Sequence, residues 1–160
     1  MDTFPIVTVP TPSLRQPSRM LEVSEIQTIE FQNFLDKLIR TMHVEDGVGI
    51  ASPQVGQNIR AIVVNLPKGP ECFTNPEVVK KSEAMIDSEE GCLSVPGKFG
   101  IVQRHKKVSI RALNRLGRRV EFDVKAFPAI IFQHEIDHLD GVLFIDKAKN
   151  IVEATHGKHI

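Results

Sequence analysis

The chain has 160 residues, of which 41% are hydrophobic and 25% are charged; this composition is ordinary for one soluble globular domain and excludes a largely disordered chain. Twenty Lys and Arg residues balance twenty Asp and Glu residues, so we expect neither a nucleic-acid-binding protein nor one held on membranes by charge. Apolar runs are far shorter than the roughly 20 residues of a spanning helix, no secretory signal is visible at the start, and two cysteines cannot form a disulfide framework.

The N-terminal part of the chain predicts one long helix. Four prolines keep the first 20 residues extended, and Ser24 to Gln27 then has the pattern of a helix N-terminus. Apolar residues recur at helical spacing from there on, which predicts a helix over 25–44 that ends at Asp46-Gly47. Residues 47–56 are mostly small and predict a loop that a ligand or another backbone approaches closely.

Strands dominate the middle of the sequence. Residues 59–66 are rich in β-branched side chains and predict a buried strand, and 72–80 predicts a short strand interrupted at Asn75-Pro76. Apolar residues alternate over 108–112 and again over 120–124, on either side of a turn, which predicts an antiparallel hairpin.

The C-terminal part predicts a short, deeply buried helix over 128–139, followed by Gly141. Residues 147–160 have weak periodicity and are expected to be a partly frayed tail. Because strands outnumber helices and do not alternate with them regularly, we expect an α+β fold. It should form a small single domain over 1–160, with antiparallel sheets around the buried helix.

That helix carries the motif H-E-x-x-H at residues 134–138. Residues four apart lie on one face of a helix, so His134 and His138 can bind one metal ion. Glu135 lies beside that face and can move a proton of an attacking water. Polar groups in an otherwise apolar helix are costly without partners, and a shared metal resolves that cost.

The third ligand is not fixed by spacing alone. Cys92, in a stiff segment between Gly91 and Pro96, is either a metal thiolate or a small buried apolar residue. Glu153 is the one downstream carboxylate in the tail, and His156 and His159 are expected to be solvated near the end of the sequence.

Two alternative functions follow from the same residues. A closed zinc site that adds Cys72 to Cys92 and the two histidines would make a peptide-binding module without catalysis. A metalloprotease of other specificity is the second alternative, although Phe144 stands where a metzincin has its third histidine.

Three segments together resemble the signature motifs of the peptide deformylases. They are Gly47-Val48-Gly49-Ile50-Ala51-Ser52-Pro53-Gln54, Glu90-Gly91-Cys92-Leu93-Ser94-Val95-Pro96 and Gln133-His134-Glu135-Ile136-Asp137-His138-Leu139-Asp140-Gly141. The resemblance runs from near the N-terminus to about Asp146, with the motifs in the order that the family has. It implies a small α+β domain and a hydrolase that removes the formyl group from formylmethionine of new peptides.

The resemblance also implies a set of ligands and a metal. Cys92, His134 and His138 match the three metal ligands of that family, and Fe²⁺ is its usual ion, with Zn²⁺, Ni²⁺ or Co²⁺ as substitutes. The implied substrate is an N-formylmethionyl peptide on ribosome-associated nascent chains, acted on by a cytoplasmic monomer. A deformylase-like protein that binds peptides without turning them over is the third alternative.

Roles for the remaining residues follow partly from the resemblance and partly from helix geometry. By resemblance, the Gln54 side chain and the Leu93 backbone N–H stabilise the oxyanion. Apolar residues on the stripe that leads away from His134 predict a floor for a methionine side chain, and backbone groups of small residues are expected to bond an extended peptide. These substrate-binding residues are Val48, Gly49, Gly91, Phe127, Ile130 and Ile131.

Three further residues bear on the site. Arg104 is a candidate partner that orients Asp137 or Glu135. Phe99 lies where some members of the family have a basic residue near the bound peptide, and Ser52 stands where many have alanine.

Overall fold

The computed structural model of the protein describes residues 2–155, 157 and 159–160. It has three α-helices and three short 3-10 helices: α1 (Val23–Ile26), α2 (Ile29–Val44), α3 (Phe127–Leu139), η1 (Pro12–Arg15), η2 (Ser52–Val55) and η3 (Phe144–Asp146). The strands are β1 (Gly49–Ala51), β2 (Ala61–Leu66), β3 (Gly69–Lys81), β4 (Met85–Cys92), β5 (Val95–His105), β6 (Lys107–Leu113), β7 (Arg119–Lys125) and β8 (Lys149–Glu153).

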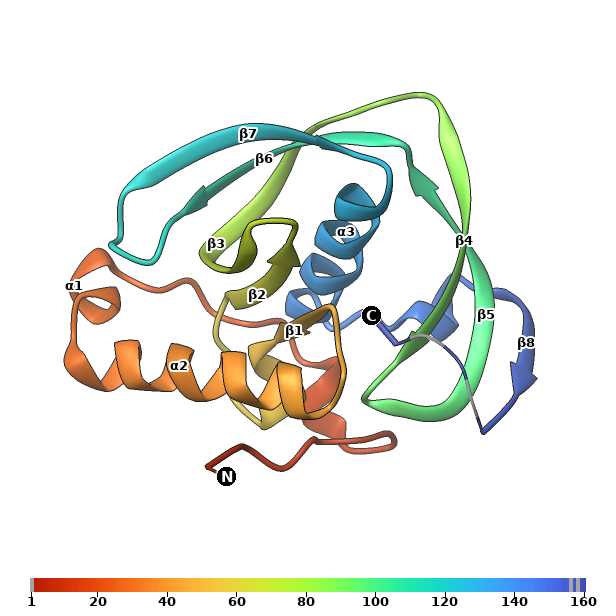
Figure 1. Ribbon diagram of the computed structural model, residues 1–160, viewed down its shortest axis with the longest axis horizontal. Helices are drawn as coiled ribbons and strands as arrows, with labels where there is room; N and C mark the ends of the chain where they lie inside the picture. Colours follow the sequence, from red (N-terminus) through yellow and green to blue (C-terminus); the bar gives the residue numbers. More distant parts are fainter. Residues whose placement is uncertain (1, 156, 158) are drawn as a thin grey trace.

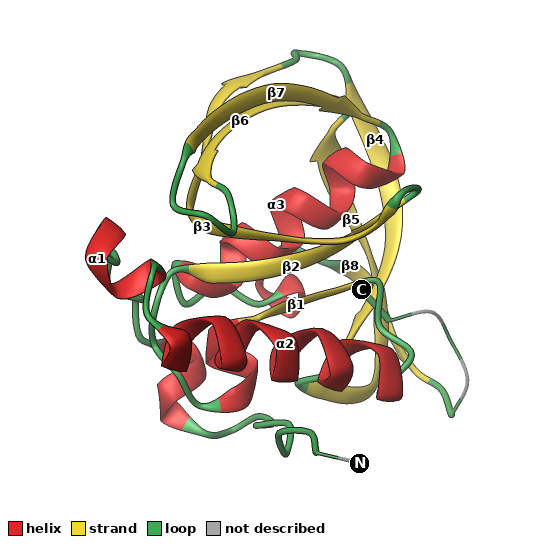
Figure 2. Ribbon diagram, turned by 60° about the vertical axis from the view of Figure 1, so that its left-hand side comes forward, coloured by secondary structure: helices red, strands yellow, loops and turns green. Residues whose placement is uncertain are grey.

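The strands form two antiparallel sheets around α3. One sheet has the order β1-β2-β3-β6-β7 and the other has the order β4-β5-β8. Figure 1 shows β6 and β7 arching over α3, with β4 and β5 on its other side. In Figure 2, α2 lies on the opposite face of β1 and β2 from α3. The expected α+β single domain with antiparallel sheets around the motif helix is confirmed.

Strand β2 explains why residues 59–66 are so uniformly apolar. Successive side chains of a strand point to opposite faces. Ile62 and Val64 join the core cluster that contains α3, whereas Ala61 and Val63 join the cluster that contains α2. The strand is therefore buried on both faces, between the two helices.

The predicted helix over 25–44 is interrupted. The structure has α1 and α2 with a break at Gln27 and Thr28, and the Thr28 hydroxyl accepts a hydrogen bond from the Phe31 N–H at 3.2 Å. A hydroxyl at this position satisfies an N–H that the first helical turn leaves free, so it starts a new helix. Apolar periodicity continues across the break, and this is why spacing alone missed it.

The strand predicted over 72–80 is longer than expected, and the interruption at Asn75 is real. Asn75 has φ +51° and its side-chain amide bonds both the N–H and the C=O of Leu21, at 2.9 and 2.8 Å. The register with β6 shifts between Thr74 and Glu77. This kink ties the N-terminal segment to the large sheet.

The hairpin of β6 and β7 and the buried helix α3 are confirmed with small changes of boundary. The pair β4 and β5 had no prediction, because its residues mix charges and glycines without strict alternation. The tail differs from the expected frayed segment: β8 pairs with β5, and Ile160 is only 1% exposed. Long-range pairing thus places β8 in the small sheet, although these residues have little periodicity of their own.

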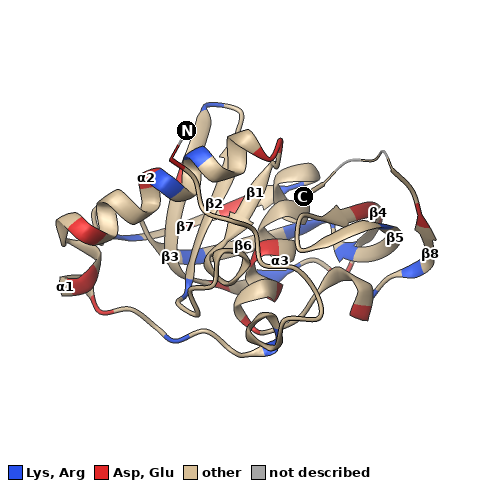
Figure 3. Cartoon of the chain, turned by 90° about the horizontal axis from the view of Figure 1, so that it is seen from below, with Lys and Arg blue, Asp and Glu red and all other residues tan. Residues whose placement is uncertain are grey.

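Figure 3 shows acidic and basic residues on the same elements, for example along α2. This interspersion fits the zero formal net charge of the sequence. Among the residues that the structure describes, no helix has the length and apolarity to cross a bilayer.

Candidate active site

Helix α3 positions the motif because it is anchored at its start and along its side. Pro128 lies in its first turn, where a missing N–H costs nothing. The Gln133 side chain accepts a hydrogen bond from the His105 N–H at 3.0 Å and donates one to the His105 C=O at 2.9 Å. These two bonds fix the rotation of α3 against β5, and with it the direction of its histidines.

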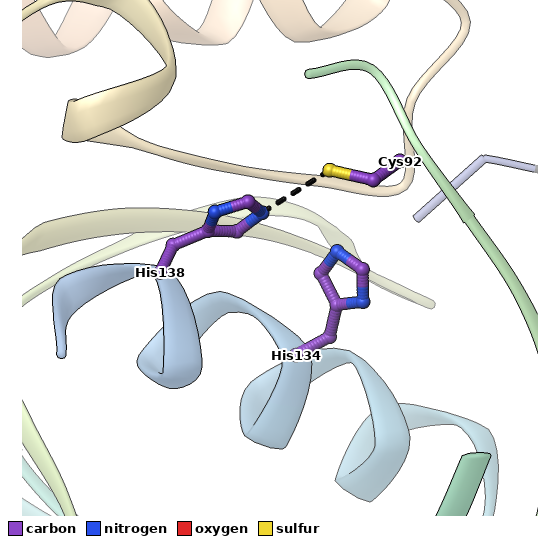
Figure 4. Close-up of side chains that lie close together, drawn as sticks. All are labelled: Cys92, His134 and His138. Carbon is purple, nitrogen blue, oxygen red and sulfur yellow. Dashed lines mark hydrogen bonds between the residues drawn. The ribbon is translucent and has the colours of Figure 1, made fainter. Parts of the chain in front are cut away.

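His134 and His138 lie one turn apart on the same face of α3, with ring centroids 5.1 Å apart. Cys92, the last residue of β4, faces them, and its Sγ lies 3.3 Å from Nε2 of His138 (Figure 4). One ligand atom from each of the three residues lies within 4.8 Å of the others. Thiolate and imidazole ligands of one tetrahedral ion would be about 3.5 Å apart, given bond lengths of about 2.3 and 2.0 Å.

The turn between β4 and β5 and the N-terminal segment bring the cysteine into place. The register of the two strands shifts between Gly91 and Cys92, which redirects the Cys92 side chain. Farther along, the Val7 N–H bonds the Gln54 C=O at 2.8 Å and the Val9 N–H bonds the Ser94 C=O at 2.9 Å. An extended segment rich in prolines thus joins the two loops that approach α3.

Several buried polar atoms around this centre have no partner among the described residues. They are Nε2 of His134, Nδ1 of His138 and both carboxylate oxygens of Glu135. All three side chains are at most 2% exposed. Buried polar atoms are rarely left unpaired, so Nε2 of His134 points to a ligand. With Nε2 of His138 and Sγ of Cys92, which lie 3.3 Å apart, it makes a donor set that suits a divalent transition metal. The residues present therefore fit a single metal ion.

Burial sets the direction of the pKa shifts at this centre. It raises the pKa of the Cys92 thiol, and the charge of Glu135 raises it further. Burial, followed by the charge of Glu90, holds the pKa of Glu135 well above its usual range. Burial and the charge of His134 hold the pKa of His138 well below its usual range. A cation at the centre would offset the cost of burying a Cys92 thiolate and a Glu135 carboxylate, and it would favour the neutral imidazole of His138.

Glu90 is the functional neighbour that sequence reasoning missed. Its carboxylate lies 2.8 Å from Nδ1 of His134 and accepts two hydrogen bonds from Arg104, at 2.7 and 2.9 Å. Burial by itself raises the pKa of Glu90, but the hydrogen bonds from Arg104 and His134 outweigh it and lower the pKa to about 2. Its place two residues before Cys92 was the available signal.

Arg104 was expected to orient Asp137 or Glu135. It bonds Asp137 at 2.7 Å, and its other partner is Glu90 rather than Glu135. Arg104 is 2% exposed, and its guanidinium therefore joins β4, β5 and α3 in a buried network. An imidazole held through its other nitrogen keeps one tautomer and one orientation.

The Gln54 side chain lies at the centre, and the backbone of Gly49 on β1 lies close to Glu135. The Gln54 side chain accepts from the Ala51 N–H at 2.9 Å, and its Nε2 lies 3.6 Å from Sγ of Cys92 and 3.3 Å from Oγ of Ser94. Gly49 packs directly on Glu135, because a β-carbon on Gly49 would lie 2.7 Å from Oε1. Leu93, half-buried, follows Cys92 in the turn.

The apolar residues predicted beside the motif divide into two groups. Ile130 and Ile131 are buried in the core cluster that half-buried Val48 packs against. Phe127 lies in the first turn of α3 and is 37% exposed. Gly91 is buried at the end of β4.

The other candidate ligands lie elsewhere. Cys72 is in the cluster that contains α2, and burial raises the pKa of its thiol to about 11. Glu153 is exposed in β8, and His159 packs beside Phe99. His156 lies outside the described residues. The structure therefore brings together Cys92 and the two histidines, without Cys72 or Glu153.

The sequence is similar to those of known proteins over almost its whole length. The family model described as polypeptide deformylase matches residues 3–154. The chain belongs to the polypeptide deformylase family. A peptide deformylase of Desulforudis audaxviator is 44% identical over 152 residues, which cover 94% of this chain and 97% of that protein.

Solved deformylase structures share the fold as well as the sequence. A class I type b peptide deformylase from Acinetobacter baumannii superposes with a TM-score of 0.89 at 34% identity, covering 92% of this chain and 100% of that one. The enzyme from Thermotoga maritima gives a TM-score of 0.87 at 34% identity, covering 93% and 99%. The chain is thus a peptide-deformylating enzyme that acts on the N-terminal formyl group of new peptides, and its Cys/His/His centre supports one metal ion.

Proposed function

We propose that Cys92, His134 and His138 hold one divalent metal ion and that the residues around it hydrolyse the formyl amide of an N-formylmethionyl peptide. The observation that carries this is the meeting of three ligand atoms beside a buried carboxylate that has no partner among the described residues. When bound there, a divalent ion supplies a Lewis acid that polarises the formyl carbonyl and makes water more acidic. By resemblance we propose Fe²⁺, with Zn²⁺, Ni²⁺ or Co²⁺ as substitutes.

Glu135 is the proposed general base and acid. Its carboxylate, which no described residue bonds, lies beside the ligand face of α3, where it can accept a proton from the attacking water. The water oxygen forms a bond to the formyl carbon, the bond from that carbon to nitrogen breaks, and Glu135 passes its proton to the leaving amine. The products are formate and a peptide with a free amino group.

Gln54 and Leu93 are the proposed donors to the oxyanion. The Gln54 amide cannot turn freely, because its oxygen accepts from the Ala51 N–H and its nitrogen therefore faces Cys92. The Leu93 backbone N–H would be the second donor, from the turn that follows Cys92. A preorganised donor of this kind is worth about 3 kcal/mol of transition-state stabilisation.

The peptide groove is proposed between the edges of the two sheets. Strand β1 is an outer strand of the large sheet and β4 is an outer strand of the small one. Backbone groups of Val48, Gly49 and Gly91 on these edges can bond an extended peptide. Ile130 and Ile131, with Phe127 farther out on the helix, would line the pocket for the methionine side chain. A structure of the Acinetobacter baumannii enzyme bound to Met-Ala-Ser, with a TM-score of 0.87, supports a peptide ligand.

The cellular setting is proposed with the same function. Family members act on formylated peptides, and we propose nascent chains at the ribosome as the substrates of this one. The proposed enzyme is a cytoplasmic monomer with a single catalytic domain over 1–160.

The deciding experiment is the release of formate from formyl-Met-Ala-Ser under anaerobic conditions. The free-amine peptide and the acetylated peptide serve as controls. We expect formate from the formylated peptide alone. Cleavage of the Met-Ala bond would point instead to a metalloprotease, and peptide binding without formate would point to a binding protein.

The iron assignment has its own test, through oxidation in air. Fe²⁺ beside a thiolate reacts with oxygen, so the iron form should lose activity faster than the nickel form, with Cys92 oxidised to sulfenic or sulfinic acid. Cys72, buried and un-ionised, should remain reduced. Equal half-lives for the iron and nickel forms, with Cys72 oxidised first, would contradict both assignments.

A further inference from the structure

The side chain of Ile160 is buried in the core cluster to which the helix with the metal ligands contributes. It is 1% exposed and belongs to the same core cluster as Ile130 and Ile131. Its backbone N–H donates to the Gly91 C=O at 3.2 Å. Figures 1 and 2 both place this end of the chain between β1 and α3 on one side and β4 and β5 on the other.

Gly157 and His159 lie against Phe99 of β5. A β-carbon on Gly157 would lie 2.4 Å from Cε1 of Phe99, so the backbone of Gly157 approaches the face or edge of the ring as only glycine can. The rings of His159 and Phe99 have centroids 5.4 Å apart. Phe99 is 4% exposed as a result of its packing, although it lies on the small outer sheet.

These contacts converge on one pair of facing residues. Phe99 of β5 and Gly91 of β4 are cross-strand partners. Gly157 and His159 contact the first, and Ile160 bonds the second. Because three separate residues of the tail use one cross-strand pair, the tail is docked in a defined position.

The docked position coincides with the groove proposed for the peptide. β4 pairs only with β5 within the described sheet, so the Gly91 C=O lies on a free edge that an extended peptide can use. The pocket of Ile130 and Ile131 is the one proposed for the methionine side chain. Because Ile160 is buried in the cluster that contains both residues, a peptide side chain packed there at native density would have to displace it.

We propose that Ile160 is an internal occupant of the substrate pocket, and that the tail formed by Gly157, His159 and Ile160 competes with peptide substrates. The inference rests on the pocket assigned under the proposed function. A tethered segment has a high effective concentration, so even weak docking competes with a dilute peptide. Phe99, in place of the basic residue that some family members have, provides the aromatic surface on which the tail docks.

The competition is tested by comparing the full chain with Ile160→Ser and with a variant that ends at Thr155. Ile160→Met keeps an apolar side chain, and Ile151→Ser changes a β8 residue that is 45% exposed and outside the pocket. If the open form is populated at about a tenth to a third, the KM for formyl-Met-Ala-Ser should fall by about 3- to 10-fold in the first two variants. The kcat should stay unchanged, and Ile160→Met and Ile151→Ser should behave like the full chain.

Binding without turnover separates this inference from the proposed function. The Kd of Met-Ala-Ser should fall by the same factor in Ile160→Ser, and saturating peptide should shift the Ile160 methyl resonances toward solvent-exposed values. Unchanged KM and Kd in both variants, or Ile160 methyl resonances that stay buried with the peptide bound, would overturn the inference. If no form releases formate, the proposed function fails, yet the peptide titration still shows whether the tail is displaced.

Discussion

Gly49 and Glu135 are in such close contact that no side chain fits between them. A β-carbon on Gly49 would lie 2.7 Å from Oε1 of Glu135 and 2.9 Å from Cγ2 of Ile131. Strand β1 and helix α3 therefore hold the carboxylate of the proposed proton carrier by close packing, while no described residue hydrogen-bonds it. This approach explains why residue 49 is a glycine.

Replacing that glycine should displace the carboxylate. We expect Gly49→Ala to lower kcat by about 100-fold, the size of effect that a displacement of about 1 Å can have, and to destabilise the fold by about 1–3 kcal/mol through overpacking. Both should be measured on the metal-loaded protein, together with its metal content. In a Glu135→Ala background the same substitution should cost clearly less stability; an equal cost would mean that Ile131, and not Glu135, is the neighbour that matters.

Glu135→Gln tests the proton carrier itself. The amide keeps the shape of the side chain but cannot accept a proton, so kcat should fall by about 100- to 10,000-fold. Metal content should stay at the level of the unsubstituted chain, because Glu135 is not among the three ligands. Formate release and metal analysis on the same sample decide the matter, and turnover close to normal with full metal would remove Glu135 from the mechanism.

Arg104→Ala tests the buried network behind the ligands. It leaves the Glu90 carboxylate buried without its main partner, which should destabilise the fold by about 3–5 kcal/mol. Metal affinity should fall by about 10- to 100-fold, because the carboxylate that orients His134 loses its position. Urea unfolding and metal titration give the two values.

An exposed arginine provides the matched control. Arg111 bonds Glu121 at 3.2 Å, with side chains that are 38% and 52% exposed. Arg111→Ala should cost less than about 1 kcal/mol and leave metal affinity unchanged. Similar losses in both variants would show that the effect of Arg104→Ala is general and not a property of the site.

The two cysteines should differ in metal binding. Cys92→Ser should lose most of the metal and the activity, because a neutral hydroxyl is a far poorer ligand than a thiolate. Cys72→Ser should keep both. Metal content after dialysis is the measurement, and full retention in Cys92→Ser would require a different third ligand.

Cys72 should also make stability depend on alkaline pH. Burial raises the pKa of its thiol to about 11 from an ordinary value of 9.0. Because the pKa is higher in the folded state, the neutral thiol contributes fully to the free energy of unfolding below pH 9. That contribution is lost as the pH rises toward 11. Between pH 8 and 10.5 the free energy of unfolding should fall by about 2 kcal/mol through this residue.

Urea unfolding of the parent chain and Cys72→Ala at both pH values isolates this residue. The stability difference between the two proteins should narrow as the pH rises. A difference that stays constant would mean that Cys72 titrates at its ordinary pKa in the folded state.

Local periodicity in the sequence determined the elements that depend on near neighbours. The spacing of His134 and His138 places two imidazoles on one face of any helix, whatever surrounds it. The β6–β7 hairpin and helix α3 follow from alternation and apolar density in the same way. The break at Thr28 was missed because a capping hydroxyl changes the backbone without changing the apolar pattern.

Only the tertiary structure decided which distant groups meet. Cys92 and His138 are 46 positions apart, and Glu90 and His134 are 44 apart. The residues themselves named Cys92 as one option among several ligands, and the position of Glu90 two residues earlier did not show which side chain it would orient. Ile160 reaches Gly91 across still more of the chain. Side-chain periodicity reports which face of an element is buried, but the partner of that face is set by strand pairing and packing across the whole domain, and these have no local signature.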